Sequence, residues 1–293
     1  MHILTPQLGN DYQLIDTGNG HKLEQIGNNM ISRPDTNCVW QPAQQARIWQ
    51  KATARWEKGE GWEFLHGFKE PWIFRYTTAH KESLLRHVLQ FELRAHESKN
   101  IGIFPEQASQ WEWMIKIILA APTPPSVLNL FGYTGAATLC AAAAGASVCH
   151  VDASKAAVSW ARKNQALSGL EQASIRWIVD DCKKFVDREI RRGAHYDGLI
   201  IDPPAFGRDQ KGNQFEFEKQ IYALLASCKQ LLGPDPRFVI FNGYSMGYSA
   251  TVLKNLMLDF YPKKELMFGE LHLQQANSSH TLPCSLFVRF ANV

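Results

Sequence analysis

The segment Asp202-Pro203-Pro204-Ala205-Phe206 carries the most specific chemical pattern in the sequence. The apolar run Gly198-Leu199-Ile200-Ile201 directly before it predicts a buried strand, which would deliver a single carboxylate to its end. Two prolines then fix the backbone and supply no N–H donors, so the Asp202 carboxylate and nearby carbonyl groups remain as acceptors. Phe206 adds a flat ring that can stack on a base. The alternative is a rigid proline turn without catalytic function.

A second pattern, Phe131-Gly132-Tyr133-Thr134-Gly135, follows another apolar run. Its two glycines allow a sharp turn and a close approach to a ligand. The helix expected next would offer free N–H groups to a carboxylate or a pyrophosphate. The dinucleotide fingerprint Gly-x-Gly-x-x-Gly is absent, which disfavours NAD. A tight strand–helix turn that binds nothing is the alternative.

Acidic residues follow the next two predicted strands. Asp152, in Val151-Asp152-Ala153-Ser154, can accept hydrogen bonds from both hydroxyl groups of a ribose. Asp181, in Asp180-Asp181-Cys182, can accept a hydrogen bond from the amine of an adenine. Both places also suit helix capping, by Ser154 in the first case and by Asp181 in the second.

A regular alternation of strands and helices positions these segments. The predicted strands are 127–131, 147–151, 175–179, 197–202, 238–242, 265–273 and 284–290. The predicted helices between them are 136–144, 154–167, 183–192, 215–232 and 250–260. The pattern indicates an α/β fold with a Rossmann-like, doubly wound, mostly parallel seven-stranded sheet, in which a final hairpin adds one antiparallel strand. Ligands of such sheets bind beyond the carboxyl ends of the strands, so the segments above should share one edge.

The chain before this alternation predicts a smaller, β-rich α+β domain. We expect domains at 1–99 and 100–293, with a possible role in substrate recognition for the first. Within it we expect a β meander over 12–33 and strands at 62–65, 72–77 and 86–95. Pro42 is expected to open a helix with Ala46, Trp49, Thr53 and Trp56 on one face. Most of the tryptophans should belong to the core, although some could supply a stacking surface.

Composition sets the outer bounds. The 293 residues include 45% hydrophobic residues and carry a net charge of +3, which suits a nucleic-acid partner without identifying one. No run of about 18 apolar residues and no basic-then-apolar leader is present, so we expect a cytoplasmic protein that does not contact a membrane. The cysteines lack Cys-x-x-Cys spacing and the histidines lack His-Glu-x-x-His, which favours free thiols and no metal.

Together these residues resemble class I S-adenosylmethionine-dependent methyltransferases, and more closely the family that modifies ribosomal RNA of the large subunit. The resemblance covers about residues 100–293. Its most specific stretches are Leu128–Gly135, Val151–Ala156 and Asp202–Phe206. Phe104-Pro105-Glu106-Gln107 also resembles the segment that precedes the family's Rossmann core and helps to cover the cofactor.

The resemblance implies a cofactor, a partner and a set of site residues. The cofactor is S-adenosylmethionine, with S-adenosylhomocysteine as the product, and the partner is RNA, ribosomal in this family. The implied cofactor-binding residues are Phe104, Gln107, Asn129, Phe131, Gly132, Tyr133, Thr134, Gly135, Asp152, Ala153, Ser154, Asp181, Cys182 and Asp202. The implied catalytic residues are Asp202, Pro203, Pro204 and Phe206, and those expected to contact RNA are Phe206, Arg208 and Lys211. The Phe131–Gly135 turn would hold the methionine end, Asp152 the ribose and Asp181 the adenine amine.

The sequence departs from the family pattern in one chemically important respect. Methylation of carbon 5 of cytosine needs a cysteine nucleophile, because that carbon reacts only after a thiolate adds to the ring. The two places for it hold Ala205 and Phe241-Asn242-Gly243-Tyr244-Ser245. We therefore favour methylation of a base nitrogen. The first 99 residues also show no recognisable RNA-binding module of the kind that family members often carry.

Other functions remain open at this point. Lys184, Arg188 and Arg191 share one helical face and could extend an RNA-binding patch, or form a solvated face balanced by Asp187 and Glu189. A methyltransferase of a small molecule or a protein side chain would use the same cofactor site. A non-catalytic RNA-binding module is a further alternative, which Asp152 and Asp202 argue against.

Overall fold

The computed structural model describes residues 1–78, 88–95, 98–208, 214–233, 235–244 and 247–292. Its chain forms two compact units. The first, which we call the α/β unit, comprises Met1–Leu4, Ser109–Leu271 and Cys284–Val293. The second, the β-rich unit, comprises Thr5–Ala108 and His272–Pro283.

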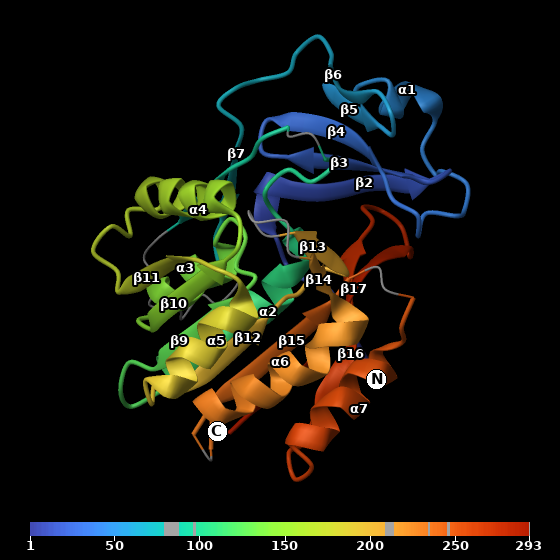
Figure 1. The fold of residues 1–293 in the computed structure, drawn as a ribbon. Coiled ribbons are helices and arrows are strands. Elements are labelled where there is room, and N and C mark those ends of the chain that lie inside the picture. Colours follow the sequence, from blue (N-terminus) through green and yellow to red (C-terminus); the bar gives the residue numbers. More distant parts are fainter. Residues whose placement is uncertain (79–87, 96–97, 209–213, 234, 245–246, 293) are drawn as a thin grey trace. The chain divides into compact units, whose positions relative to one another are not determined.

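The α/β unit is built on a sheet whose strands lie in the order β1-β16-β17-β15-β12-β9-β10-β11 (Figure 1). Their bounds are β1 His2–Leu4, β9 Ser126–Leu130, β10 Ser147–Asp152, β11 Ile175–Val179, β12 Gly198–Ile201, β15 Phe238–Gly243, β16 Met267–Gln274 and β17 Thr281–Ala291. Strands β9 to β12 and β15 pair in parallel, whereas β17 pairs antiparallel with β15. The predicted mostly parallel Rossmann-like sheet of seven strands is therefore confirmed.

Strand β1 adds an eighth strand to this sheet, which the sequence did not indicate. It pairs in parallel with β16, so that His2 lies opposite Gly269. Three residues are too few to show the alternation of apolar and polar positions by which strands are recognised. The pairing of the first residues with a strand near the other end of the chain depends on the whole fold.

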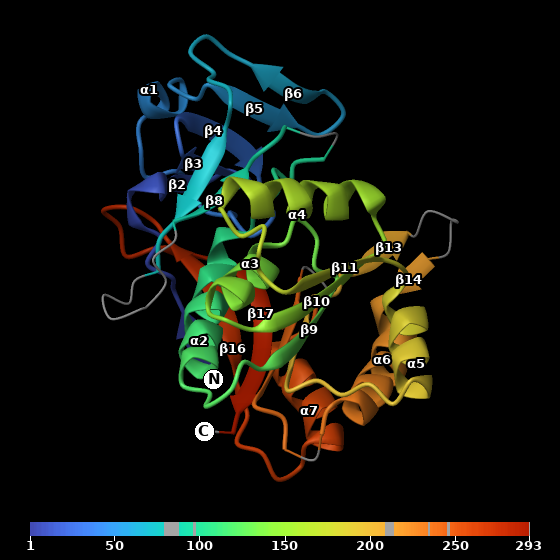
Figure 2. The ribbon, with the colours of Figure 1, turned by 90° about the vertical axis from the view of Figure 1, so that its left-hand side faces the viewer.

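Helices cover both faces of the sheet (Figure 2). One face carries α5 Cys182–Arg191, α6 Phe217–Leu231 and α7 Ala250–Phe260, and the other carries α2 Ala108–Leu119, α3 Ala136–Ala143 and α4 Lys155–Leu167. The alternation along β9 and β10 explains this division. Leu128, Leu130, Cys149 and Val151 join the core shared with α5, α6 and α7, because successive strand residues point to opposite faces.

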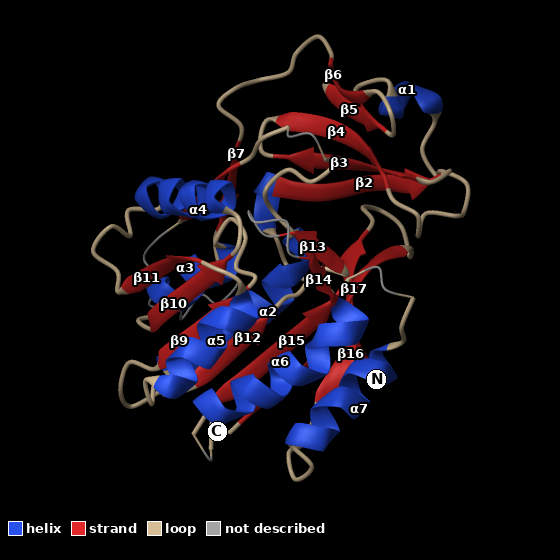
Figure 3. Ribbon diagram, viewed as in Figure 1, coloured by secondary structure: helices blue, strands red, loops and turns tan. Residues whose placement is uncertain are grey.

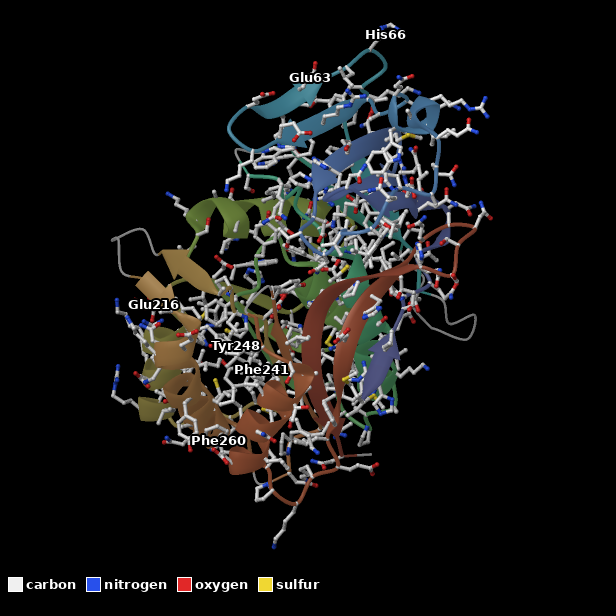
Figure 4. The ribbon with its side chains drawn as sticks, turned by 90° about the vertical axis from the view of Figure 1, so that its right-hand side faces the viewer. Glu63, His66, Glu216, Phe241, Tyr248 and Phe260 are labelled. Carbon is white, nitrogen blue, oxygen red and sulfur yellow. The ribbon has the colours of Figure 1, made fainter. Side chains whose placement is uncertain are left out.

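A short hairpin lies between β12 and α6. Its strands are β13 Phe206–Arg208 and β14 Gln214–Glu216, which pair antiparallel. Phe217, the first residue of α6, stacks on Phe241 of β15 with ring centroids 6.1 Å apart, and its ring also contacts Tyr248 at 5.9 Å. Figure 4 shows Phe241 and Tyr248 beside α6, with Glu216 at the start of that helix. This packing fixes the end of β15 against α6.

The β-rich unit contains a sheet in the order β2-β3-β4-β5-β6 and a separate pair, β7 with β8. Their bounds are β2 Tyr12–Gly18, β3 His21–Ile26, β4 Asn29–Pro34, β5 Ala54–Glu57, β6 Gly61–Phe64, β7 Ile73–Tyr76 and β8 Leu89–Glu92. Figure 3 shows how little of this unit is helical. The predicted meander over 12–33 is confirmed. The exposed Glu63 and His66 mark the far end of β6 and the turn after it (Figure 4).

The helix predicted to begin at Pro42 is wrong beyond one turn. Only α1, Ala46–Trp49, is helical, and the next residues enter β5. Ala54 pairs with Ile31 of β4, and the Thr53 N–H donates to the Met30 carbonyl. These contacts with a distant strand outweigh the helical spacing, because helix propensity is a weak preference that tertiary pairing overrides.

Two findings bear on membranes and thiols. None of the helices in the described ranges has the length and apolarity to cross a bilayer. The six cysteines, all within the described ranges, are thiols outside any disulfide, and five of them are buried.

Candidate cofactor and active site

The predicted site segments follow three neighbouring parallel strands. Leu130 of β9 lies opposite Val151 of β10 on one side and opposite Ile201 of β12 on the other. The Phe131–Gly135 turn and Asp202 come directly after their strands, and Asp152 is the last residue of β10, so all of them lie at the same edge. This is the edge where ligands bind in parallel α/β sheets.

The turn after β9 has an unusual backbone. Phe131, Tyr133 and Gly135 have φ angles of 58°, 48° and 89°, so left-handed residues alternate along it. Two of the three are not glycine, and such strained positions concentrate at ligand-binding sites. An alternation of left-handed residues also turns backbone N–H groups into an anion-binding concavity. The Phe131–Gly135 turn is thus suited to a carboxylate group.

Asp152 ties this turn to β10. Its Oδ2 accepts a hydrogen bond from the Tyr133 N–H at 2.8 Å, and its Oδ1 accepts one from the Ser154 N–H at 2.8 Å. Burial raises the pKa of Asp152, which these two N–H groups only partly offset. Each carboxylate oxygen retains a second lone pair. The side chain can therefore hold the turn and still accept hydrogen bonds from a ribose.

The helix caps expected as alternatives are both present. The Ser154 hydroxyl accepts from the Ala157 N–H at 3.2 Å, and Asp181 Oδ1 accepts from the Lys184 N–H at 2.9 Å. The cap uses one carboxylate oxygen of Asp181. The contact of Asp181 with an adenine amine stays a prediction. The next residue, Cys182, is buried, and burial raises the pKa of its thiol well above the usual range.

Asp202 follows β12 directly. Its backbone N–H donates to the Leu130 carbonyl at 3.4 Å, and its Oδ1 is shielded from solvent. Pro203 is buried and Pro204 half-buried. The proline pair thus leads from the shared edge into β13.

The predicted RNA-contacting residues are only partly described. Phe206 and Arg208 lie in β13, but their side chains are outside what the structure describes, and so is all of Lys211. In the basic patch on α5, Arg188 donates to Asp180 at 2.7 Å, which favours the balanced helix face for that residue.

Three predicted cofactor residues do not directly follow a strand of the parallel sheet. Asn129 is buried within β9, where its side chain donates to Thr138 at 2.8 Å. Phe104 and Gln107 belong to the β-rich unit, in and beside the short 3-10 helix Pro105–Gln107. Their contacts with the cofactor stay predictions.

His150 and Thr138 form a contact that the sequence analysis missed. The His150 Nδ1 lies 2.9 Å from the Thr138 Oγ1, and both side chains are fully buried. One signal was available, since a histidine two positions before Asp152 is unusual in an otherwise apolar strand.

The arrangement fits a ligand that joins an amino acid to a nucleoside. The Phe131–Gly135 turn suits the carboxylate of the amino acid, and the Asp152 carboxylate suits ribose hydroxyl groups. Without side chains at Gly132 and Gly135, the backbone of the turn packs closely on β10 and α4. These are the groups that S-adenosylmethionine presents.

A profile of the S-adenosylmethionine-dependent methyltransferase family matches residues 75–247. The chain therefore belongs to this family, and its cofactor is S-adenosylmethionine. The resemblance found in the sequence is confirmed.

Individual relatives agree with this assignment. The S-adenosylmethionine-dependent methyltransferase from Agrobacterium tumefaciens has a crystal structure that covers 99% of this chain and 93% of its own, with a TM-score of 0.91 and 38% identity. The Ribosomal RNA large subunit methyltransferase K/L of Shewanella baltica is 38% identical over 118 residues, which are 40% of this chain and 16% of that protein. A methyltransferase structure that contains S-adenosylhomocysteine has a TM-score of 0.70 at 17% identity and shares the fold.

Proposed function

We propose that this chain methylates a nitrogen atom of a base in RNA, and that its substrate is ribosomal RNA. The observation that carries the proposal is the position of Asp202. Its carboxylate follows β12 at the edge that also carries the Phe131–Gly135 turn, and two prolines follow it. The name of the K/L relatives supports ribosomal RNA as the substrate, although the match spans only 16% of the first of them.

The proposed chemistry asks little of the protein beyond alignment. When bound, S-adenosylmethionine supplies a methyl group that its sulfonium already activates. Asp202 would accept a hydrogen bond from the N–H of the acceptor amine and take up its proton as the N–C bond forms. Pro203 and Pro204 would hold that carboxylate in place. Phe206 would stack on the extruded base.

The chain's thiols support nitrogen rather than carbon 5 as the acceptor. Cys182, itself a predicted cofactor-binding residue, is buried, and burial raises the pKa of its thiol well above the usual range. A thiol in that state is a poor nucleophile, because the thiolate is the reactive form. The two places for the nucleophile that the family resemblance implies hold Ala205 and Phe241-Asn242-Gly243-Tyr244-Ser245.

The remaining roles complete the proposal. The Phe131–Gly135 turn would hold the methionine end, Asp152 the ribose and Asp181 the adenine amine. Arg208 and Lys211 would contact phosphate groups. The N-terminal residues 1–99 would recognise the substrate, and ribosomal RNA as substrate fits the cytoplasmic location expected from the sequence.

Mass spectrometry of ribosomal RNA nucleosides tests this function. Cells that lack the gene should lose one N-methylated nucleoside, which the wild-type gene restores and the Asp202→Ala variant does not. An unchanged nucleoside profile would contradict the proposal. Loss of a carbon-5 methyl group, or methyl transfer only to a protein or small-molecule fraction, would also contradict it and would favour the corresponding alternative.

A further inference from the structure

A network of buried polar side chains packs against the Phe131–Gly135 turn. His150, in the middle of β10, is 0% exposed. Its Nδ1 lies 2.9 Å from Thr138 Oγ1, and the Asn129 side-chain amide donates to the same oxygen at 2.8 Å. The His150 Nε2 is also buried, and no hydrogen-bond partner for it lies among the residues that the structure describes.

Hydrogen bonds hold the imidazole of His150 in place. Thr138 Oγ1 accepts from the Asn129 amide and lies within hydrogen-bond distance of His150 Nδ1. With one hydrogen and two lone pairs, the Thr138 hydroxyl can pair with either tautomer of the ring. Burial lowers the pKa of His150 to about 3, which keeps the ring neutral. On its other side the ring contacts Trp177 of β11, with ring centroids 4.6 Å apart.

The two glycines of the turn rest directly on these side chains. An added Cβ at Gly132 would lie 2.4 Å from Cε1 and 2.5 Å from Nδ1 of His150. An added Cβ at Gly135 would lie 3.0 Å from the Cβ of Ala161 in α4 and 3.6 Å from the ring of Trp177. The backbone of the turn is therefore in contact with the ring of His150, with no space between them.

Three successive residues of β10 contact the same turn. Asp152 accepts from the Tyr133 N–H, and the Val151 carbonyl accepts from the Gly132 N–H at 3.1 Å. His150 lies under Gly132 without a hydrogen bond to it, so its contribution is the position of its ring. These contacts hold the turn against β10.

We propose that His150 is a positioning residue for the cofactor. Its ring, which contacts Thr138 and Trp177, sets how closely the backbone of Gly132 can pack on β10. It thereby keeps the Phe131–Gly135 turn in the left-handed conformations that bind the methionine carboxylate. The proposal rests on the proposed function only for the role of the turn, and it does not depend on the RNA substrate.

A double substitution tests the proposal. The Gly132→Ala variant should weaken S-adenosylhomocysteine binding, measured by calorimetry, roughly 10- to 100-fold, because its methyl group collides with the His150 ring. His150→Ala alone should weaken binding several-fold, because the turn loses its support. The Gly132→Ala/His150→Ala variant should bind S-adenosylhomocysteine at least about tenfold more tightly than Gly132→Ala does, because the ring that causes the collision is gone. Gly233→Ala is the matched control, since its Cβ would meet nothing within 4 Å.

Two results would overturn the proposal. The first is a double variant that binds no better than Gly132→Ala. The second is a His150→Ala protein with the affinity of the wild type. Thermal unfolding of each variant verifies that it is folded, and Gly132→Ala/His150→Ser replaces any double variant that is not, with the same expected recovery. Wild-type protein that binds S-adenosylhomocysteine but methylates no RNA would contradict the proposed function alone.

In turnover assays, a His150→Ala protein should show a raised KM for S-adenosylmethionine with kcat largely retained. A general loss of structure would instead lower kcat and the folded fraction together. A fall in kcat at unchanged KM would contradict a role in holding the cofactor.

Discussion

Asp152 ends β10 and Asp181 comes shortly after β11, and both carboxylates accept hydrogen bonds from backbone N–H groups. Of these contacts, the residue types and their spacing predicted the helix cap by Asp181 but not the two hydrogen bonds to Asp152. His150 differs, because its contacts join β10 to α3, β11 and the turn after β9. No local pattern carries that information. The sequence therefore indicated the acidic residues of the site and missed the histidine that supports them.

Replacement of Asp152 tests whether its carboxylate holds the Phe131–Gly135 turn and binds the ribose of the cofactor. The Asp152→Asn variant keeps one acceptor oxygen but places an NH2 group against a backbone N–H. We expect roughly 10- to 100-fold weaker binding of S-adenosylhomocysteine by calorimetry. The exposed Asp235, paired with Lys264, offers the control Asp235→Asn, which should bind like the wild type. Unchanged affinity in Asp152→Asn would show that this carboxylate holds neither the turn nor the ribose.

The neutral state of His150 predicts how stability depends on pH. Burial lowers the folded-state pKa from 6.5 to about 3. Between these values the unfolded chain binds a proton that the folded chain does not, so stability falls as pH decreases through this window, by about 1.4 kcal/mol per pH unit. Denaturant titrations at about pH 7 and about pH 5 should therefore show a smaller loss in His150→Gln than in the wild type. Equal losses would mean that His150 titrates normally.

At the scale of elements, the sequence predicted the positions of strands and helices best in the α/β unit, where strands and helices alternate along the chain. Strands β9, β10, β12 and β15 are largely buried on both faces and appear as mostly apolar runs, which makes their positions clear. In the β-rich unit the signals were weaker. The segment after Pro42 has helical spacing, but Ala54 pairs with a strand that lies over twenty residues earlier. Such pairing is decided by the sheet and not by the segment.

Asp16 of β2 shows how one residue holds that segment. Its buried carboxylate accepts hydrogen bonds from the Ala43 and Gln44 N–H groups, from the Trp49 ring at 2.9 Å and from the Gln275 side chain at 2.9 Å. Asp16→Ala would leave these buried donors unsatisfied.

We expect Asp16→Ala to lower the free energy of unfolding of the β-rich unit by about 2 to 4 kcal/mol. Tryptophan fluorescence during denaturant unfolding can measure this loss, since Trp49 reports on the segment. The exposed Glu63 provides the control Glu63→Ala, with an expected change within about 0.5 kcal/mol. A similar small change in Asp16→Ala would show that the four hydrogen bonds do not stabilise the segment.

At the scale of the whole molecule, each of the two units is built from segments that are not continuous in the sequence. Met1–Leu4 joins the α/β unit, and His272–Pro283 joins the β-rich unit, where Gln275 contacts Thr17 and Asp16. Neither contribution has a signal in composition or periodicity, because each depends on contacts between the two ends of the chain. The family, by contrast, follows from segments that lie at one sheet edge, and these were visible in the sequence.

The most direct test of the account measures methyl transfer and cofactor binding on the same samples. Wild-type protein and the Asp202→Ala variant are given radiolabelled S-adenosylmethionine and ribosomal RNA, and S-adenosylhomocysteine affinity is measured in parallel. We predict that the variant binds within about threefold of the wild type but transfers methyl groups at least roughly 100-fold more slowly. Turnover close to that of the wild type in Asp202→Ala would contradict the account, because Asp202 would then not be the group that accepts the proton of the amine.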